Sequence, residues 1–159
     1  MCCSTQRSYS IASAPNGRSL ELTVQRTRGG EVSPYLADEL VPGDQLELRG
    51  PVGGWFVWTQ QLTEPVLLIA GASGLVPLMC MVRTRAAAGS RAPFRLLYAL
   101  RRPSDMLDSA ELLEGAPGLD TTYLYSRQAP RTHRARRDAS PRLVLLGHAP
   151  ERVRTERFG

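Results

Sequence analysis

The chain has 159 residues and a mass of 17.5 kDa, with 42% hydrophobic and 22% charged residues, which allows a packed core for one domain or two small ones. All 20 basic residues are arginine, so the composition excludes catalysis by a Schiff-base lysine and phosphate binding by a P-loop lysine. Residues 127–159 hold nine arginines and three acidic residues, so the basic charge is concentrated near the C-terminus.

The three cysteines do not indicate a disulfide framework, because Cys2 and Cys3 are adjacent. No stretch approaches the roughly 18 apolar residues of a membrane span, and the N-terminus lacks the pattern of a secretory signal. We therefore expect a cytoplasmic protein. With two histidines and no cysteine cluster at metal-binding spacing, we expect no resident metal.

Residues 6–48 have a β pattern. Apolar and polar residues alternate over residues 20–25, and Asn16-Gly17 is typical of a hairpin turn. A further strand is expected around residues 46–48, after the turn at residues 42–44.

A short helix is expected between these strands. Ser33 is predicted as its N-cap and Pro34 as its first residue, and the helix is expected to end near Leu40.

The pattern changes at Pro65, so we place a boundary in residues 59–64. Apolar runs bounded by Gly and Pro predict strands buried on both faces of a parallel sheet, separated by helices. The predicted elements are a strand at Val66–Ala70, a helix at Val76–Ala88, a strand at Phe94–Leu100, a helix at Ser109–Glu114 and a strand at Thr121–Ser126, with weaker strand signals at Arg142–Leu146 and Val153–Phe158.

The first motif is RSYS, residues 7–10. On a strand, Arg7 and Tyr9 share a face while Ser10 points to the other. A cation and an aromatic ring could thus meet the phosphate and the flat ring of one ligand, although an ordinary edge strand would also explain the pattern.

The second motif is GGEVSPYL, residues 29–36. Free backbone N–H groups at a helix start favour anions, which makes Gly30, Val32 and Ser33 candidate ligand contacts. A capped helix after a flexible turn is the alternative.

The third motif is VLLIAGASGLVP, residues 66–77. A glycine turn between a buried parallel strand and a helix is a typical pyrophosphate site, although Gly71 and Gly74 depart from the G-x-G-x-x-G spacing. A turn selected only for packing is the alternative.

In this order the three motifs resemble those of the ferredoxin–NADP reductase superfamily. The resemblance implies that Arg7 binds the FAD phosphates, that Tyr9 lies on the flavin ring and that Ser10 assists near flavin N5. It also implies that Gly30, Val32 and Ser33 bind the FAD pyrophosphate. Tyr9 and Ser10 are therefore the candidate catalytic residues.

For the second dinucleotide, the resemblance assigns the pyrophosphate of NADP or NAD to Gly71, Ser73, Gly74 and Pro77, with Ala72 where a second glycine is usual. The residues that could hold a 2′-phosphate follow the predicted strands, and solvated surface arginines are an equal alternative; these residues are Arg101, Ser126 and Arg127, with the neighbouring Arg102. Phe158 is a candidate for the aromatic residue that approaches the flavin near the C-terminus of some family members.

The expected fold class is β followed by α/β. Residues 1–60 would form a partial FAD-binding antiparallel β-barrel, and residues 61–159 an incomplete NAD(P)-binding domain with a parallel sheet. Only residues 1–5 precede the R-x-Y-[ST] segment, and no Cys-Gly-Pro follows Leu143–Leu146, so we expect a truncated member of the family.

The leading hypothesis is a flavin-dependent oxidoreductase that passes electrons from NAD(P)H through FAD to a separate acceptor protein, a monooxygenase or a ferredoxin-like protein. The alternative is a catalytically impaired remnant that still binds a dinucleotide. Nucleic-acid binding through the arginines of residues 127–159 is not expected, because no aromatic residues are interleaved with them and no binding module is recognised.

Overall fold

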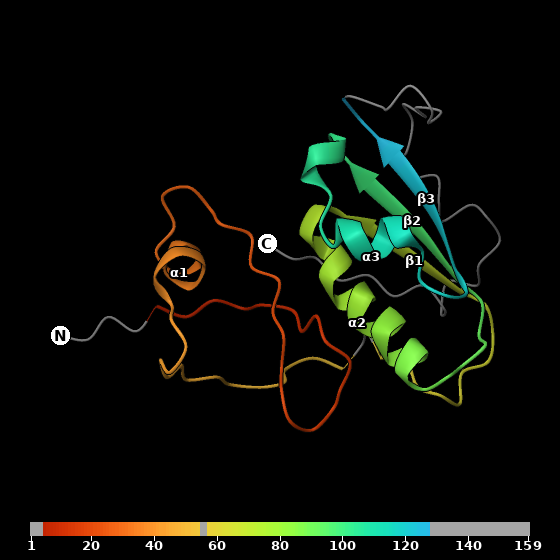
Figure 1. The fold of residues 1–159 in the computed structure, drawn as a ribbon, viewed down its shortest axis with the longest axis horizontal. Coiled ribbons are helices and arrows are strands. Elements are labelled where there is room, and N and C mark those ends of the chain that lie inside the picture. Colours follow the sequence, from red (N-terminus) through yellow and green to blue (C-terminus); the bar gives the residue numbers. More distant parts are fainter. Residues whose placement is uncertain (1–4, 55–56, 128–159) are drawn as a thin grey trace.

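The computed structural model describes residues 5–54 and 57–127. The N-terminal part forms a winding chain around one short helical segment, whereas the later part forms a sheet with helices beside it (Figure 1). The elements in chain order are α1 (Val32–Pro34), η1 (Tyr35–Glu39), β1 (Val66–Gly71), η2 (Ala72–Gly74), α2 (Leu75–Ala87), β2 (Phe94–Leu100), η3 (Pro103–Asp105), α3 (Ser109–Glu114) and β3 (Leu119–Tyr125).

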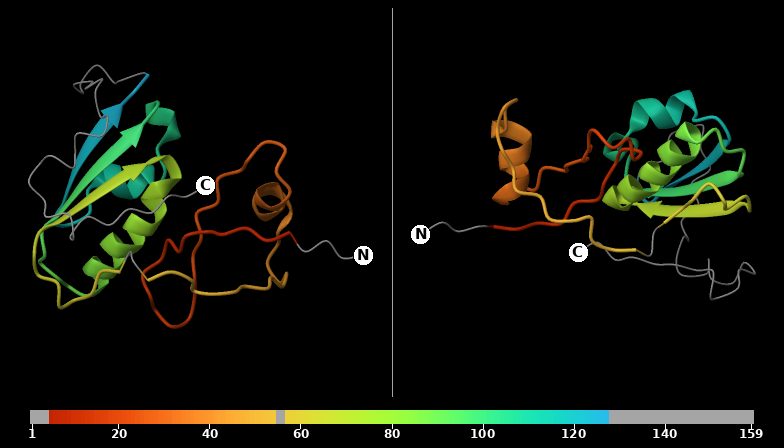
Figure 2. Two further views of the ribbon diagram at one scale, coloured as in Figure 1. Left: turned by 180° about the vertical axis from the view of Figure 1, so that it is seen from behind. Right: turned by 90° about the horizontal axis from the view of Figure 1, so that it is seen from below.

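The sheet has three parallel strands in the order β1-β2-β3, with Val66 opposite Phe94 and Phe94 opposite Leu119. This confirms the predicted β-α-β-α-β order. The helices α2 and α3 lie on the same side of the sheet (Figure 2, right). Leucines and aromatic residues from β1, β2 and α2 interlock there; the most deeply buried side chains are Tyr98, Phe94, Leu75, Met79, Leu96 and Val82.

The opposite face of the sheet differs from the prediction of strands buried on both faces. Ile69 on β1 is 50% exposed, and Arg95 on β2 and Asp120 on β3 are exposed and joined by an ion pair of 3.2 Å. Because α2 and α3 cover one face, no described helix shields the other.

The antiparallel barrel expected for residues 1–60 is not confirmed. Among the described residues of this part, the antiparallel pairing is one isolated bridge between Ile11 and Leu22, supported by the Ala12 N–H donating to the Glu21 carbonyl at 2.8 Å. The strands predicted at residues 20–25 and 46–48 are therefore wrong as regular strands. Alternating residues predict which face a strand would bury, but a strand forms only where a partner completes its hydrogen bonds.

The hairpin turn itself is confirmed. Gly17 has φ of 70°, and the Asn16 side chain accepts the backbone N–H groups of Arg18 and Ser19, each at 2.9 Å. The turn thus forms from its own residues, without a continuing ladder.

The short helix begins earlier than predicted, and Ser33 is not its N-cap. Glu31 occupies that position, and Ser33 is a buried helical residue whose hydroxyl accepts the Thr27 N–H at 3.0 Å. The serine closes the turn that precedes the helix instead of capping it, because that amide competes for the same oxygen.

Trp58 connects the two parts of the chain. It is 7% exposed and packs edge-on against Phe94, with ring centroids 5.5 Å apart. The boundary predicted in residues 59–64 stays a prediction. The strands predicted at Arg142–Leu146 and Val153–Phe158, together with Phe158, lie outside the described residues. Within the described part, no helix has the length and apolar character needed to cross a membrane.

Candidate functional site

The loop between β1 and α2 is built to leave its backbone accessible. A Cβ atom added at Gly71 or Gly74 would meet nothing within 4 Å, so there is open space on the side where a ligand would approach. The loop leads through η2 into α2, and the Leu75 N–H donates to the Ala72 carbonyl. The N–H groups of Ala72 and Ser73 precede the first hydrogen bonds of this helical stretch, so they have no partner within it. These amides and the positive end of the helix dipole fit a pyrophosphate.

Ala72 in this loop has a left-handed backbone with φ of 47°. Residues with a side chain adopt this region at a cost, and glycine adopts it freely. Ala72 stands where the resembling family usually has a second glycine. Glycine at this position would adopt the observed backbone without strain.

The Tyr98 side chain holds the loop through a hydrogen bond. This residue was not identified from the sequence. Its hydroxyl donates to the Ala72 carbonyl at 3.3 Å and accepts the Leu107 N–H at 3.4 Å. The side chain is fully buried, and burial raises the pKa of the phenol. A tyrosine near the end of a buried strand next to a glycine loop was the available signal.

The predicted 2′-phosphate residues meet at the ends of β2 and β3. The Ser126 N–H donates to the Leu100 carbonyl at 2.9 Å, and the Arg127 N–H donates to the Arg101 carbonyl at 3.1 Å. Arg101, Arg102 and Arg127 are exposed. Because β1 is parallel to both strands, these arginines share the carboxyl edge of the sheet with the glycine loop.

The chain just before the RSYS segment is held near the second motif. The Thr5 hydroxyl, two residues before Arg7, donates to the Glu31 carboxylate at 2.9 Å. Tyr9 and Ser10 are half-buried, and Arg7 is exposed with its guanidinium donating to the Gln6 carbonyl at 2.8 Å. A cation, a phenol ring and a hydroxyl are therefore available on one short segment, a donor set that fits a flavin dinucleotide.

The turn of the second motif uses some of its polar groups internally. The Gly30 N–H donates to the Thr27 carbonyl at 3.0 Å, and a Cβ at Gly30 would lie 3.4 Å from the Ser33 hydroxyl oxygen. The backbone N–H groups of Val32 and its neighbours in the first turn are the donors suited to an anion.

No hydrogen bond or ion pair among the described residues joins the RSYS segment directly to the loop at residues 71–77. The connection runs through α2, where Cys80 donates to the Ser13 carbonyl at 3.0 Å and Arg83 donates to the Ala12 carbonyl at 2.7 Å. Sequence reasoning missed both residues. Their i, i+3 spacing, which puts both side chains on one side of α2, was the signal.

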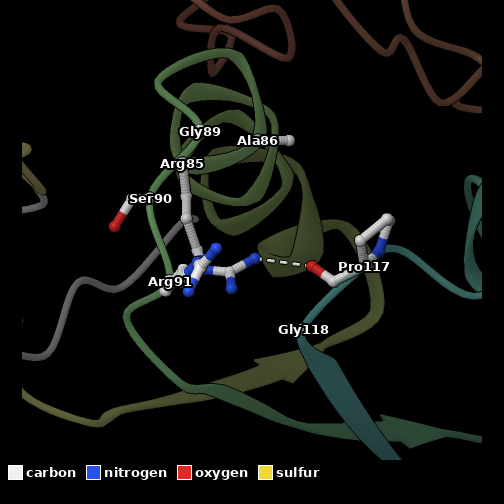
Figure 3. Close-up of a pocket in the computed structure, with 7 residues that line it drawn as sticks. All are labelled: Arg85, Ala86, Gly89, Ser90, Arg91, Pro117 and Gly118. Atoms are coloured by element: carbon white, nitrogen blue, oxygen red, sulfur yellow. Dashed lines mark hydrogen bonds between the residues drawn. The ribbon is translucent and has the colours of Figure 1, made fainter.

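A surface hollow at the other end of α2 has a structural role. There Arg85 is 5% exposed and donates to the Ala92 and Pro117 carbonyls at 2.6 Å, as the dashed line to Pro117 shows (Figure 3). The hollow lies at the amino ends of β2 and β3, away from the glycine loop. In the described part of the chain, no group of three His, Cys, Asp or Glu residues is placed to hold a metal ion.

Comparison with known proteins agrees with this geometry. Residues 3–57 match the family described as an oxidoreductase FAD-binding domain. A flavohemoprotein of Deinococcus radiodurans is 33% identical over 127 residues, which are 78% of this chain and 31% of that protein.

The ferredoxin–NAD(P)⁺ reductase component of the naphthalene 1,2-dioxygenase system of Pseudomonas putida is 30% identical over 67% of this chain and 32% of its own length. The crystal structure of a cytochrome P450 reductase from Amycolatopsis superposes with a TM-score of 0.69 at 30% identity, over 84% of this chain and 42% of that one.

The chain spans about a third of the length of these two curated relatives. The resemblance inferred from the three motifs is confirmed by sequence and by fold, and FAD and NAD(P) are the cofactors that this assignment supports. The chain belongs to the ferredoxin–NADP reductase-like superfamily of oxidoreductases.

Proposed function

We propose that this chain is a flavin-dependent oxidoreductase that takes electrons from NAD(P)H and passes them through FAD to a separate acceptor. The observation that carries the proposal is the open glycine loop at the start of α2, on the same chain as an FAD-binding match at residues 3–57. Two dinucleotide sites on one chain suit transfer between two cofactors.

Each part of the chain would hold one cofactor, with residues 1–60 on the flavin side and residues 61–159 on the nicotinamide side. The chemistry that the cofactors supply when bound is hydride donation and the storage of one or two electrons. Arg7 would neutralise FAD phosphate, Tyr9 would cover the flavin ring, and Ser10 would offer a hydroxyl near N5. Val32 and its neighbours at the start of α1 would donate to the FAD pyrophosphate.

On the nicotinamide side, the N–H groups around Ser73 and Gly74 would donate to the pyrophosphate. Pro77 suits the first turn of α2 because its missing N–H has no partner to lose there. Gly71 would leave room for the ligand to reach the backbone.

NADPH is proposed as the preferred donor, because Arg101 and Arg127 adjoin at the carboxyl edge of the sheet and are exposed. The double variant Arg101→Ala with Arg127→Ala should raise the KM for NADPH by roughly tenfold or more, since each charge-assisted phosphate bond contributes about 1.5–3 kcal/mol. The KM for NADH should change less than twofold. Equal KM values for both donors in the unmodified chain would remove these roles.

The acceptor is proposed to be a separate protein of the oxygenase or ferredoxin class. This rests on relatives named as reductase components, among them the naphthalene dioxygenase reductase of Pseudomonas putida and a glycine betaine monooxygenase reductase subunit of Pseudomonas aeruginosa.

A second candidate is a dinucleotide-binding remnant without turnover. It is favoured because the described residues of the first part show one isolated bridge, between Ile11 and Leu22, where a barrel was expected. Purified chain mixed with FAD and NADPH, followed by reduction of a dye acceptor, separates the two. Retained FAD with NADPH-dependent dye reduction supports the oxidoreductase. If the chain retains the nucleotide but does not reduce the dye, and circular dichroism shows that it is folded, the result supports the remnant.

A further inference from the structure

One side of α2, away from the sheet, carries a polar contact that the three motifs do not explain. Val76, Cys80 and Arg83 recur at i, i+4 and i+7, so they share one side of the helix. Val76 is 3% exposed but lies outside the main core cluster between α2 and the sheet. This side of α2 therefore serves a different contact.

That contact is the chain just after the RSYS segment. Ala12 is 2% exposed and Ser13 is 8% exposed, in a region where most residues are exposed or half-buried. Their carbonyls accept the Arg83 guanidinium at 2.7 Å and the Cys80 thiol at 3.0 Å. The two residues are thus buried and bonded against α2.

Arg83 is itself held in place from the other side. Its guanidinium pairs with the Glu111 carboxylate at 2.5 Å and with Asp108 at 3.4 Å, at the start of α3. Burial opposes its charge, but the bond to Glu111 and the charges of both carboxylates outweigh burial and raise the pKa of Arg83. Arg83 is thus held by α3, and its Nη1 donates to the Ala12 carbonyl in the N-terminal segment that would hold the flavin.

Along the backbone, the Arg83–Ala12 contact lies within a short distance of both proposed cofactor sites. Ser10 is two residues from Ala12, or about 7 Å in extended chain. Arg83 lies eight residues beyond Leu75, or about 12 Å along the helix from the nucleotide loop.

We propose that Arg83 is a positioning residue, which fixes the flavin-side segment against α2 and so sets the alignment between the nicotinamide and flavin sites. The inference rests on the proposed function and goes beyond it, since Arg83 belongs to neither cofactor motif. A misplacement of about 1 Å between reacting groups can cost roughly 100-fold in rate. The planar Arg83 guanidinium, held by the Asp108 and Glu111 carboxylates, is rigid enough to maintain such an alignment.

The test compares Arg83→Met, which keeps the apolar stem, with Arg83→Lys, which keeps the charge. Arg95→Met is the matched control, because Arg95 forms an exposed ion pair with Asp120 on the far face of the sheet. The full chain is used throughout. Hydrogen exchange of residues 11–22 is measured without cofactor. The rate of FAD reduction by NADPH is measured by stopped flow, and the binding constants of FAD and of NADPH are measured separately.

In Arg83→Met we expect exchange at residues 11–22 to rise at least roughly tenfold, because the Ala12 carbonyl loses a charge-assisted hydrogen bond. FAD reduction should slow by roughly tenfold or more, with both binding constants within about threefold of the unmodified chain. Arg83→Lys should recover part of both losses, and Arg95→Met should show neither.

Unchanged exchange in Arg83→Met would overturn the inference. Raised exchange with an unchanged reduction rate would also overturn it, since the contact would then be structural only. A chain that binds both cofactors but never reduces FAD contradicts the proposed function instead, and the exchange measurement still decides whether Arg83 fixes the segment.

Discussion

The two parts of this chain use their apolar residues differently. In residues 61–127 the leucines and aromatics of three parallel strands interlock with α2, and Leu96 and Tyr98 are fully buried. In residues 5–60 Leu48 is 66% exposed and Val52 is 86% exposed. An alternating pattern therefore specifies which face of a strand is apolar, while burial of that face needs a second layer of structure to cover it.

The sharpest test of this contrast is one substitution in each part. Leu96→Ala should lower the free energy of unfolding by about 2–5 kcal/mol, because it leaves a cavity in a close-packed core. Leu48→Ala, the matched control, should change it by less than about 0.5 kcal/mol. Chemical denaturation of both variants checks this. A loss above 2 kcal/mol in Leu48→Ala would show that residues 5–60 are packed after all.

The next effect compares two arginines. Arg85→Met should cost about 2–3 kcal/mol, because the Ala92 and Pro117 carbonyls lose a buried cationic donor. The side chain also lies over the Phe94 ring, 5.3 Å from its centroid.

Arg26→Met serves as the control in the first part, since Arg26 pairs with Asp38 while both side chains are about half exposed. Its cost should stay below about 1 kcal/mol. Equal losses in the two variants, measured by thermal unfolding, would remove the distinction between buried and surface cations.

A smaller gain is expected at the nucleotide loop. Ala72→Gly should raise stability by about 1 kcal/mol, because glycine adopts a φ of 47° without strain. Gly17→Ala in the first part should have the opposite sign, since Gly17 has φ of 70°. Denaturation midpoints for the pair give the test, and a loss in Ala72→Gly would contradict the strain at this loop.

The smallest expected effect is alkaline sensitivity of the second part. Burial raises the pKa of the Cys80 thiol above 9.0 and that of the Tyr98 phenol above 10.0. The folded chain therefore holds these protons more tightly than the unfolded chain, and the stabilisation present below those values is lost as the pH rises through the raised pKa.

Unfolding curves between pH 8 and roughly pH 11 should show falling stability, with a shallower slope in Tyr98→Phe and in Cys80→Ala. Part of the slope should remain, because burial also raises the pKa of Tyr123 and Tyr125. The same slope in both variants and in the unmodified chain would assign the titration to other groups.

Much of the second part was predictable because its signals are local. An apolar run bounded by Pro65 and Gly71 is enough to indicate β1, and Gly89 just beyond α2 indicates where that helix ends. The residues Phe94–Leu100 were predicted with the observed bounds.

What failed depends on distant partners. The alternation of residues 20–25 does not show whether a neighbouring strand exists to pair with them. The Thr27 N–H that binds the Ser33 hydroxyl comes from across a turn, so the sequence around Ser33 does not reveal it. Arg83 was missed because its role arises from Ala12 and Glu111, which are remote in sequence.

Each part of the chain is proposed to hold its own dinucleotide. Calorimetric titration of the full chain with FAD and, separately, with NADP⁺ measures this, using Arg7→Ala for the first part and Gly74→Val for the second. Arg7→Ala should weaken FAD binding by roughly tenfold and leave NADP⁺ binding unchanged, since a charge-assisted bond contributes about 1.5–3 kcal/mol. Gly74→Val should fill the open side of the loop and do the reverse. Variants that weaken both ligands equally, or neither, would contradict the account.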